Sequence, residues 1–98
     1  MSQHLKQLYI KAYFDGLPID RVLVDGGSAI NVMPQIMLRT LQRSEKELIP
    51  TEINVQGFIG VPARIKGILL VELRVGTRTS ITAFFVVETT AAYNALLG

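Results

Sequence analysis

Two strand-like segments joined by an Asp-Gly pair constrain the fold of this chain more than any other feature. In residues 8–14, apolar and polar side chains partly alternate, which is the period of a strand with one buried face. Asp15-Gly16 follows, and residues 17–25 are again strand-like. Because glycine adopts positive φ at little cost, an Asp-Gly pair between two such segments predicts a β-hairpin.

The rest of the chain predicts a second hairpin and one short helix. Residues 68–75 and 80–88 are apolar, strand-like segments on either side of a predicted turn at 76–79. Pro34 begins a helical pattern over residues 34–43, since proline is favoured at the first helical position. Four residues share one stripe of this helix: Ile36, Met37, Thr40 and Leu41. We therefore expect an all-β domain with one short helix.

The connecting segments carry weaker signals. Residues 45–47 are polar and predict a solvated link, and residues 50–58 are predicted to be extended. Glycines and a proline between residues 57 and 67 indicate a mobile hairpin. The apolar Ala-Leu-Leu-Gly at 95–98 loosely echoes Val-Leu-Val-Asp-Gly-Gly at 22–27.

Composition excludes several classes of site. With 98 residues, the chain is expected to form a single domain over residues 1–98, since domains usually span about 50–250 residues. It has no cysteine and a single histidine, His4, so disulfides, cysteine nucleophiles and cysteine-based zinc sites are ruled out. We expect no metal and no cofactor. A formal charge of +2, without a basic cluster, gives no reason to expect nucleic-acid binding.

Neither a targeting segment nor a membrane span is predicted. The first seven residues are polar, unlike a signal peptide. The longest apolar stretches, 67–71 and 81–87, are far shorter than the roughly 20 residues that a spanning helix needs. We therefore expect no membrane partner.

Asp25 is the strongest candidate for chemistry. It ends an apolar strand and precedes Gly26, Gly27 and Ser28, and a carboxylate in that position is costly unless it is hydrogen-bonded or functional. One reading is a simple turn aspartate, since Asp-Gly is a common turn pair. The other is catalytic: two carboxylates about 3 Å apart share one proton, and a two-fold dimer would supply the second copy.

Four segments, taken in order, resemble the retropepsin family, the homodimeric aspartic proteases of retroviruses and LTR retrotransposons. The resemblance is greatest to the protease domain of plant gypsy-type elements. The matching segments are the active-site loop VLVDGGSA (22–29), the helix-opening NVMP (31–34), the flap tip GFIG (57–60) and the apolar segment YNALLG (93–98). The resemblance implies a small closed or partly open barrel of the acid-protease type, with a flap hairpin.

The resemblance also implies roles for residues of the turn after Asp25. Asp25 would be the catalytic acid, one from each subunit of a homodimer. Gly26, Gly27, Ser28 and Ala29 would form the active-site loop. Within it, Gly27 would allow the partner's loop to approach, and Ser28 or its N–H would bond the Asp25 carboxylate. Catalysis would be direct attack of water on a peptide bond, with no cofactor.

The family resemblance further implies a substrate and a location. Gly57, Phe58, Ile59 and Gly60 would form the tip of a flap over residues 55–66. Backbone groups of this flap would bond an extended peptide by strand addition. The substrate would be a retrotransposon polyprotein, and the location would be cytoplasmic, including the interior of retrotransposon particles.

Two departures from the family pattern bear on activity. The middle position of the active-site turn is usually Thr or Ser, whose hydroxyl bonds across the dimer, but here it is Gly26. A weaker dimer and weaker activity are expected, since each lost buried bond costs on the order of 1 kcal/mol. The family also continues beyond the position of Gly98 with a helix and a strand that joins the subunits, so we expect a C-terminally truncated domain.

Two alternatives stay open at this point. The chain could be a non-catalytic retropepsin-fold module for dimerisation or peptide binding. It could also be an unrelated small β-barrel in which Asp25 only caps a turn.

Overall fold

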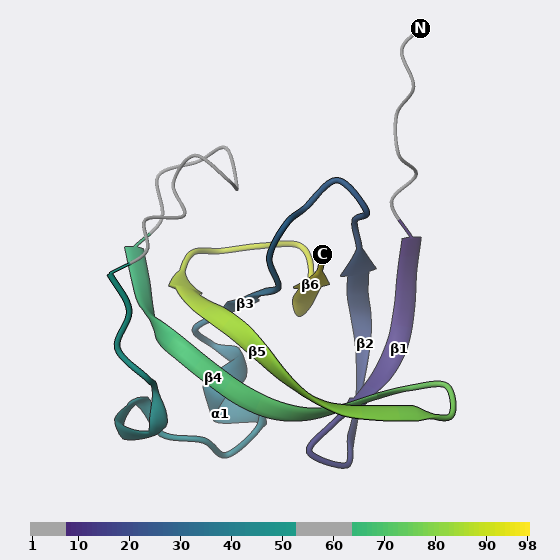
Figure 1. The fold of residues 1–98 in the computed structure, drawn as a ribbon, viewed down its shortest axis with the longest axis horizontal. Helices are drawn as coiled ribbons and strands as arrows, with labels where there is room; N and C mark the ends of the chain where they lie inside the picture. Colours follow the sequence, from purple (N-terminus) through teal and green to yellow (C-terminus); the bar gives the residue numbers. More distant parts are fainter. Residues whose placement is uncertain (1–7, 53–63) are drawn as a thin grey trace, which may run out of the picture.

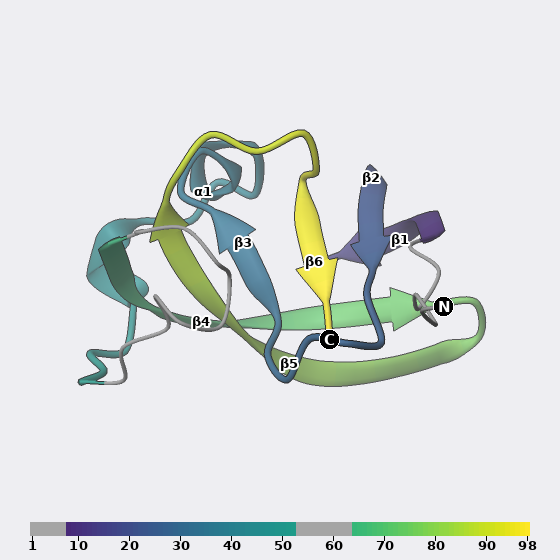
Figure 2. The same ribbon diagram turned by 90° about the horizontal axis from the view of Figure 1, so that it is seen from above.

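The computed structural model describes residues 8–52 and 64–98 of the chain. Within these ranges, six strands close a barrel in the order β1-β2-β6-β3-β5-β4 (Figures 1 and 2). The elements are β1 (Leu8–Phe14), β2 (Leu17–Val24), β3 (Val32–Pro34), α1 (Met37–Thr40), the 3₁₀ turn η1 (Glu45–Glu47), β4 (Arg64–Val75), β5 (Arg78–Glu88) and β6 (Ala95–Leu97). The predicted all-β class with one short helix is confirmed.

Both predicted hairpins form. In the first, Phe14 pairs with Leu17 across a two-residue turn. Asp15 and Gly16 both adopt positive φ, at 53° and 81°, which is the conformation that matches the twist of the flanking strands. In the second hairpin, β4 and β5 pair along their whole length and cross in front of the barrel (Figure 1). Strand β4 begins at position 64 rather than 68, and β5 begins at position 78 rather than 80.

The two segments that echo each other in sequence lie side by side. Strand β6 runs parallel to β2, with Val22 opposite Ala95 and Val24 opposite Leu97. On its other edge, β6 pairs antiparallel with β3, and β3 in turn runs parallel to β5. The short strand β6 thereby closes the barrel between the N-terminal hairpin and the rest of the sheet (Figure 2).

The helix is shorter than predicted and begins later. Pro34 is the last residue of β3 and pairs with Val87 of β5, so it does not take the first helical position. The N–H of Gln35 continues this pairing by donating to the Val87 carbonyl at 2.8 Å. The segment NVMP is therefore a buried strand end rather than a helix start, because its pairing with β5 outweighs the local preference of proline.

The way in which the backbone terminates α1 explains why the helix is short. Gln42 adopts a φ of +56°, and the N–H of Arg43 donates to the Leu38 carbonyl at 2.8 Å. The N–H of Gln42 donates to the Arg39 carbonyl at 3.1 Å. These are the two bonds of a Schellman termination, which here uses glutamine where glycine is usual.

The helix also buries a different face from the one predicted. Met37 and Leu41 are buried as expected, but Leu38 is buried with them. Ile36 is 73% exposed, and Thr40 is exposed as well. Because only one turn of helix forms, its position against the barrel, rather than a full helical stripe, decides which side chains are covered.

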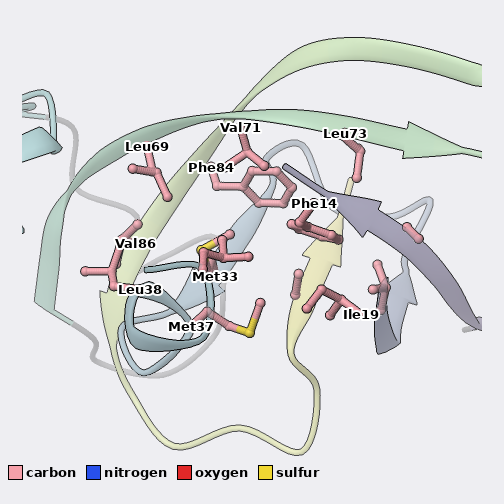
Figure 3. Close-up of a cluster of buried hydrophobic side chains, with 14 residues drawn as sticks. Phe14, Ile19, Met33, Met37, Leu38, Leu69, Val71, Leu73, Phe84 and Val86 are labelled. Carbon is pink, nitrogen blue, oxygen red and sulfur yellow. The ribbon is translucent and has the colours of Figure 1, made fainter. Parts of the chain in front are cut away.

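A single large apolar cluster fills the barrel (Figure 3). The rings of Phe14 and Phe84 lie at its centre, 5.4 Å apart and tilted by 39°, within the range favoured by aromatic pairs. The cluster draws on every strand and on α1; its members are Ala12, Phe14, Ile19, Val22, Met33, Met37, Leu38, Leu41, Leu69, Val71, Leu73, Phe84, Val86 and Ala95. A smaller cluster of Leu23, Val32, Val87 and Leu96 lies where β2, β3, β5 and β6 meet.

Arg43 joins three parts of the molecule at the base of the barrel. Its guanidinium bonds Asp15 of the first hairpin turn at 2.8 Å and the Leu70 carbonyl of β4 at 3.0 Å. It also bonds the carboxylate of Glu47 in η1. Glu47 accepts a second bond, from the N–H of Ser44 at 2.8 Å, which completes a capping box. The predicted solvated link at 45–47 is exposed, but it is an ordered turn.

The bonds to Glu47 make the stability of the fold depend on pH. The Ser44 N–H, followed by the Arg43 guanidinium, lowers the pKa of Glu47 from its ordinary value of 4.5. A carboxyl whose folded pKa is lowered adds stability above its unfolded pKa and loses it as the pH falls through the folded value. Glu47→Gln should therefore destabilise the protein at pH 7, and the difference from wild type should shrink below about pH 4.5. Urea unfolding across pH measures this.

Glu52→Gln is the matched control for this prediction. Glu52 is exposed and has no hydrogen bond or ion pair within the described ranges, so its substitution should leave the pH profile unchanged. An equal effect of both substitutions would contradict the assignment to Glu47.

Candidate active site

Asp25 is positioned by the end of β2 and by β6 beside it. Val22 and Leu23 are buried and anchor the strand in the two apolar clusters. One residue beyond the last strand pair, the N–H of Asp25 donates to the Leu97 carbonyl at 2.9 Å. The backbone of Asp25 is thus fixed by β6, which lies about seventy positions later in the sequence. Asp25 is the first residue of the loop that follows β2.

The turn after Asp25 holds the carboxylate through a backbone donor. The N–H of Gly27 donates to Asp25 Oδ1 at 2.9 Å, and the N–H of Ser28 donates to the Asp25 main-chain carbonyl at 3.0 Å. The expected bond from Ser28 to the carboxylate is therefore wrong. A four-residue turn places its last N–H on the first carbonyl, which leaves the N–H of the third residue to bond the side chain.

The hydroxyl of Ser28 braces the next bend of the loop. Ser28 Oγ donates to the Ile30 carbonyl at 2.8 Å and accepts a longer bond from the Ile30 N–H at 3.3 Å. Both bonds lie within the loop and leave the Asp25 carboxylate untouched. Ser28 therefore shapes the backbone path, while Gly26, Gly27 and Ala29 are exposed on the outside of the loop.

Gly98 packs directly behind this loop. A Cβ placed on Gly98 would lie 2.6 Å from both the Ser28 and the Ile30 carbonyl oxygens, closer than real Cβ contacts. Its N–H donates to Asn31 Oδ1 at 2.9 Å. The last residue of the apolar segment 93–98 is thus fitted against the backbone of the loop that carries Asp25.

Asn31 is a residue of this site that the sequence analysis did not single out as functional. Besides accepting from Gly98, its side chain donates to the Ala83 carbonyl at 3.2 Å. Its own carbonyl accepts from the Phe85 N–H at 2.9 Å. Asn31 therefore links the end of the loop to β5 and β6. The sequence feature that could have indicated this role is the position of Asn31, a polar residue directly before the buried strand β3.

The Asp25 carboxylate is partly exposed and has spare hydrogen-bonding capacity. Within residues 8–52 and 64–98, its only hydrogen bond is the one from Gly27, and it has no ion pair. Across the same ranges, no three Asp, Glu or His side chains gather into a group that could hold a metal ion. In one chain, this loop offers a single acid held by a backbone N–H.

Some predicted site residues lie outside the described part of the chain. These are the flap-tip residues Gly57, Phe58, Ile59 and Gly60. His4 also lies outside it. The structure therefore describes the loop that carries Asp25 and the segment behind it.

Comparison with solved structures shows which fold this is. Over 94% of this chain and 67% of the other, the structure is similar to a retropepsin-like aspartic protease from Rickettsia conorii, with a TM-score of 0.70 and 17% sequence identity. Over 100% of this chain and 72% of the other, it is similar to the retroviral protease-like domain of Ddi1 from Leishmania major, with a TM-score of 0.68 and 15% identity. The chain has a retropepsin-like fold.

This result decides against the unrelated barrel, one of the two alternatives left open by the sequence. No protein-family profile and no curated protein sequence matches the chain, so at these identities the retropepsin-like likeness rests on structure. Among the described residues, no helix has the length and apolar character needed to cross a membrane.

The tight fit behind the retropepsin-like loop predicts a large effect of one added methyl group. Gly98→Ala should destabilise the protein by about 1–3 kcal/mol, because two backbone carbonyls must move to admit the Cβ. The NMR amide signals of residues 28–31 should shift with it, since these residues line the contact. Thermal or urea unfolding and amide spectra measure the two effects.

Gly16→Ala provides the comparison for that substitution. A Cβ on Gly16 would meet no atom within 4 Å, although its φ is +81°. Its cost should be limited to backbone strain, about 1 kcal/mol, without shifts in the Asp25 loop. Undisturbed loop signals in Gly98→Ala would contradict the close packing described above.

Proposed function

We propose that this protein is an aspartic endopeptidase that works as a homodimer. The observation that carries the proposal is the placement of Asp25. It follows a buried strand of a retropepsin-like barrel, its backbone is fixed by β6, and its partly exposed carboxylate is held by the Gly27 N–H. A carboxylate presented in this way is accessible to a second copy of itself.

Two such carboxylates would supply both halves of general acid–base catalysis. When they lie about 3 Å apart they cannot both ionise, so the pair shares one proton. The ionised Asp25 takes a proton from a water molecule, which attacks the peptide carbonyl carbon. The protonated Asp25 of the other subunit donates its proton to the carbonyl oxygen. Collapse of the tetrahedral intermediate, with proton transfer to the leaving nitrogen, then breaks the peptide bond.

The proposed substrate is an extended peptide within a polyprotein of a retrotransposon. An extended chain would bind by adding a strand, with alternate side chains in apolar pockets, and residues 57–60 would cover it as a flap. Assignment to a plant gypsy-type element, and to the cytoplasm and its retrotransposon particles, belongs to the same proposal. It rests on the sequence resemblance over 22–29, 31–34, 57–60 and 93–98.

A non-catalytic role in dimerisation or peptide binding is the second candidate, and Gly26 favours it. The middle residue of the active-site turn is exposed and has no hydroxyl with which to bond across a dimer. Loss of that bond on both sides weakens the association on which a shared active centre depends. The same fold could then bind an extended peptide without cleaving it.

The catalytic proposal predicts an acid-dependent peptidase that requires Asp25. Cleavage of a denatured, unstructured protein substrate should be greatest at about pH 4–6, where a carboxyl pair with split pKa values holds one proton. Asp25→Asn should reduce the rate to background while leaving the unfolding midpoint near that of wild type. Mass spectrometry of the products measures cleavage.

Asp20→Asn is a matched control for Asp25→Asn. Asp20 is an exposed acid on β2, the strand that leads to Asp25, and its substitution should leave cleavage intact. Peptidase activity that survives in Asp25→Asn would disprove the catalytic assignment. Peptide binding without cleavage by a wild-type dimer would instead support the non-catalytic role.

Restoring the missing hydroxyl should strengthen the dimer. Gly26 is not among the described glycines with positive φ, so threonine can enter without left-handed backbone strain. Gly26→Thr should lower the dimer dissociation constant about tenfold or more, because two cross-subunit bonds of about 1 kcal/mol each are gained. Sedimentation equilibrium over a range of concentrations measures this.

Gly26→Ala separates the hydroxyl from the loss of glycine flexibility. It should tighten the dimer far less than Gly26→Thr does. Equal effects of the two substitutions would contradict the cross-subunit bond, and a strict monomer in all three proteins would contradict the homodimer.

A further inference from the structure

A cleft lies beside α1, away from the loop that carries Asp25. It has a volume of about 930 Å³, near the upper end of the range for ligand sites. In both ribbon views, α1 and the loop after β2 occupy different parts of the barrel (Figures 1 and 2). The lining comes from α1, the segments on either side of it and the end of β5, so it shares no residue with the candidate active site.

Most charged groups that line this cleft are already paired within the chain. Arg43 is held by Asp15 and Glu47. Glu45 accepts a bond from Gln35 at 2.8 Å. Lys66 pairs with Glu45 at 3.5 Å and with the other lining carboxylate, Glu88, at 3.7 Å. These groups therefore form the walls of the cleft and have little capacity left for a charged ligand.

Arg39 is the exception among the charged residues of the lining. Residues 8–52 and 64–98 give its guanidinium no hydrogen bond and no ion pair. Ile36 lies one helical turn before it, since the Arg39 N–H donates to the Ile36 carbonyl at 3.2 Å. Ile36 is the most exposed large apolar side chain of the described residues, at 73%. An unpaired cation and an uncovered aliphatic side chain thus line the same cleft.

This combination selects one kind of ligand. A guanidinium presents paired donors that match the two oxygens of a carboxylate. A phosphate dianion is disfavoured, because Glu45 and Glu88 line the same cleft and only Arg39 is unpaired. The aliphatic surface of Ile36 calls for an apolar group beside the carboxylate. Because the cleft is large and its lining is mostly exposed, a length of peptide fits it better than a small enclosed molecule.

We propose that this cleft binds an extended peptide segment in which an acidic side chain stands next to an aliphatic one. The acidic side chain pairs with Arg39, and the aliphatic one packs on Ile36. Thr89 and Thr90, which also line the cleft, offer polar groups to the peptide backbone. This site is independent of the proposed peptidase activity, and its occupant is a segment of a partner protein.

The test uses isotope-labelled Asp25→Asn protein, so that no peptide is cleaved. The probe is a short acetylated and amidated peptide with Leu-Glu-Leu at its centre, and its twin has Leu-Gln-Leu. Titration of the glutamate peptide should shift the amide signals of residues 36–39 and 88–90. The glutamine twin should bind about tenfold more weakly, as expected for loss of one charge-assisted pair.

Substitutions in the protein test the same contact from the other side. Arg39→Gln should weaken binding of the glutamate peptide about tenfold and remove the difference between the two peptides. Arg78→Gln is the matched control, since Arg78 is likewise exposed and its side chain is unpaired among the described residues, but it lies at the start of β5. Ile36→Ser should weaken both peptides alike.

Three results would overturn the proposal. The first is equal binding of the glutamate and glutamine peptides. The second is a set of shifts confined to residues 25–31, which would place the peptide at the candidate active site. The third is an absence of shifts at 36–39 at millimolar peptide. Failure at this cleft leaves the Asp25 assignment untouched, because the peptidase assay depends on a different part of the barrel.

Discussion

The parallel pairing of β2 with β6 is the interaction on which the rest of this structure depends. It closes the barrel, and it also carries the chain past Leu97 and Gly98 directly behind the loop of Asp25. A carboxylate on an unsupported turn would sample many positions. Here, its backbone is bonded to one strand, and the loop beyond it packs on the next residue of that strand. One pairing therefore sets both the topology and the position of the candidate catalytic acid.

The division between a rigid barrel and an exposed loop suits the proposed chemistry. The Phe14–Phe84 pair and the apolar cluster around it occupy the interior, so the sheet can act as a fixed base. The Asp25 side chain receives only one hydrogen bond, from Gly27. A carboxylate with remaining capacity can accept a shared proton or a water molecule, whereas a fully bonded one could not. In the proposed homodimer, the second copy would supply the other carboxylate.

The two proposed sites differ in how they use charge. At Asp25, the proposed function depends on a second carboxylate that dimer symmetry would bring close. Gly26 has no hydroxyl with which to bond across that dimer. In the cleft beside α1, Glu45 and Glu88 are offset by Lys66, and Arg39 stays available. The peptide proposed to bind at Arg39 makes no use of Asp25, because the lining of the cleft includes no residue of that loop. The two sites can thus be separated by experiment.

The sequence by itself determined the first hairpin and singled out Asp25 as the candidate acid. Alternating side chains and the Asp15-Gly16 pair specify the first hairpin, because strand period and turn conformation are local properties. The resemblance over four segments taken in order indicated the fold that the structural comparison found. Tertiary structure decided the rest. Pro34 became a strand end because β5 was there to pair with it, Asn31 became a link between strands, and Arg39 was left unpaired in a cleft. Each of these depends on residues far away in the sequence, whose proximity no local pattern contains.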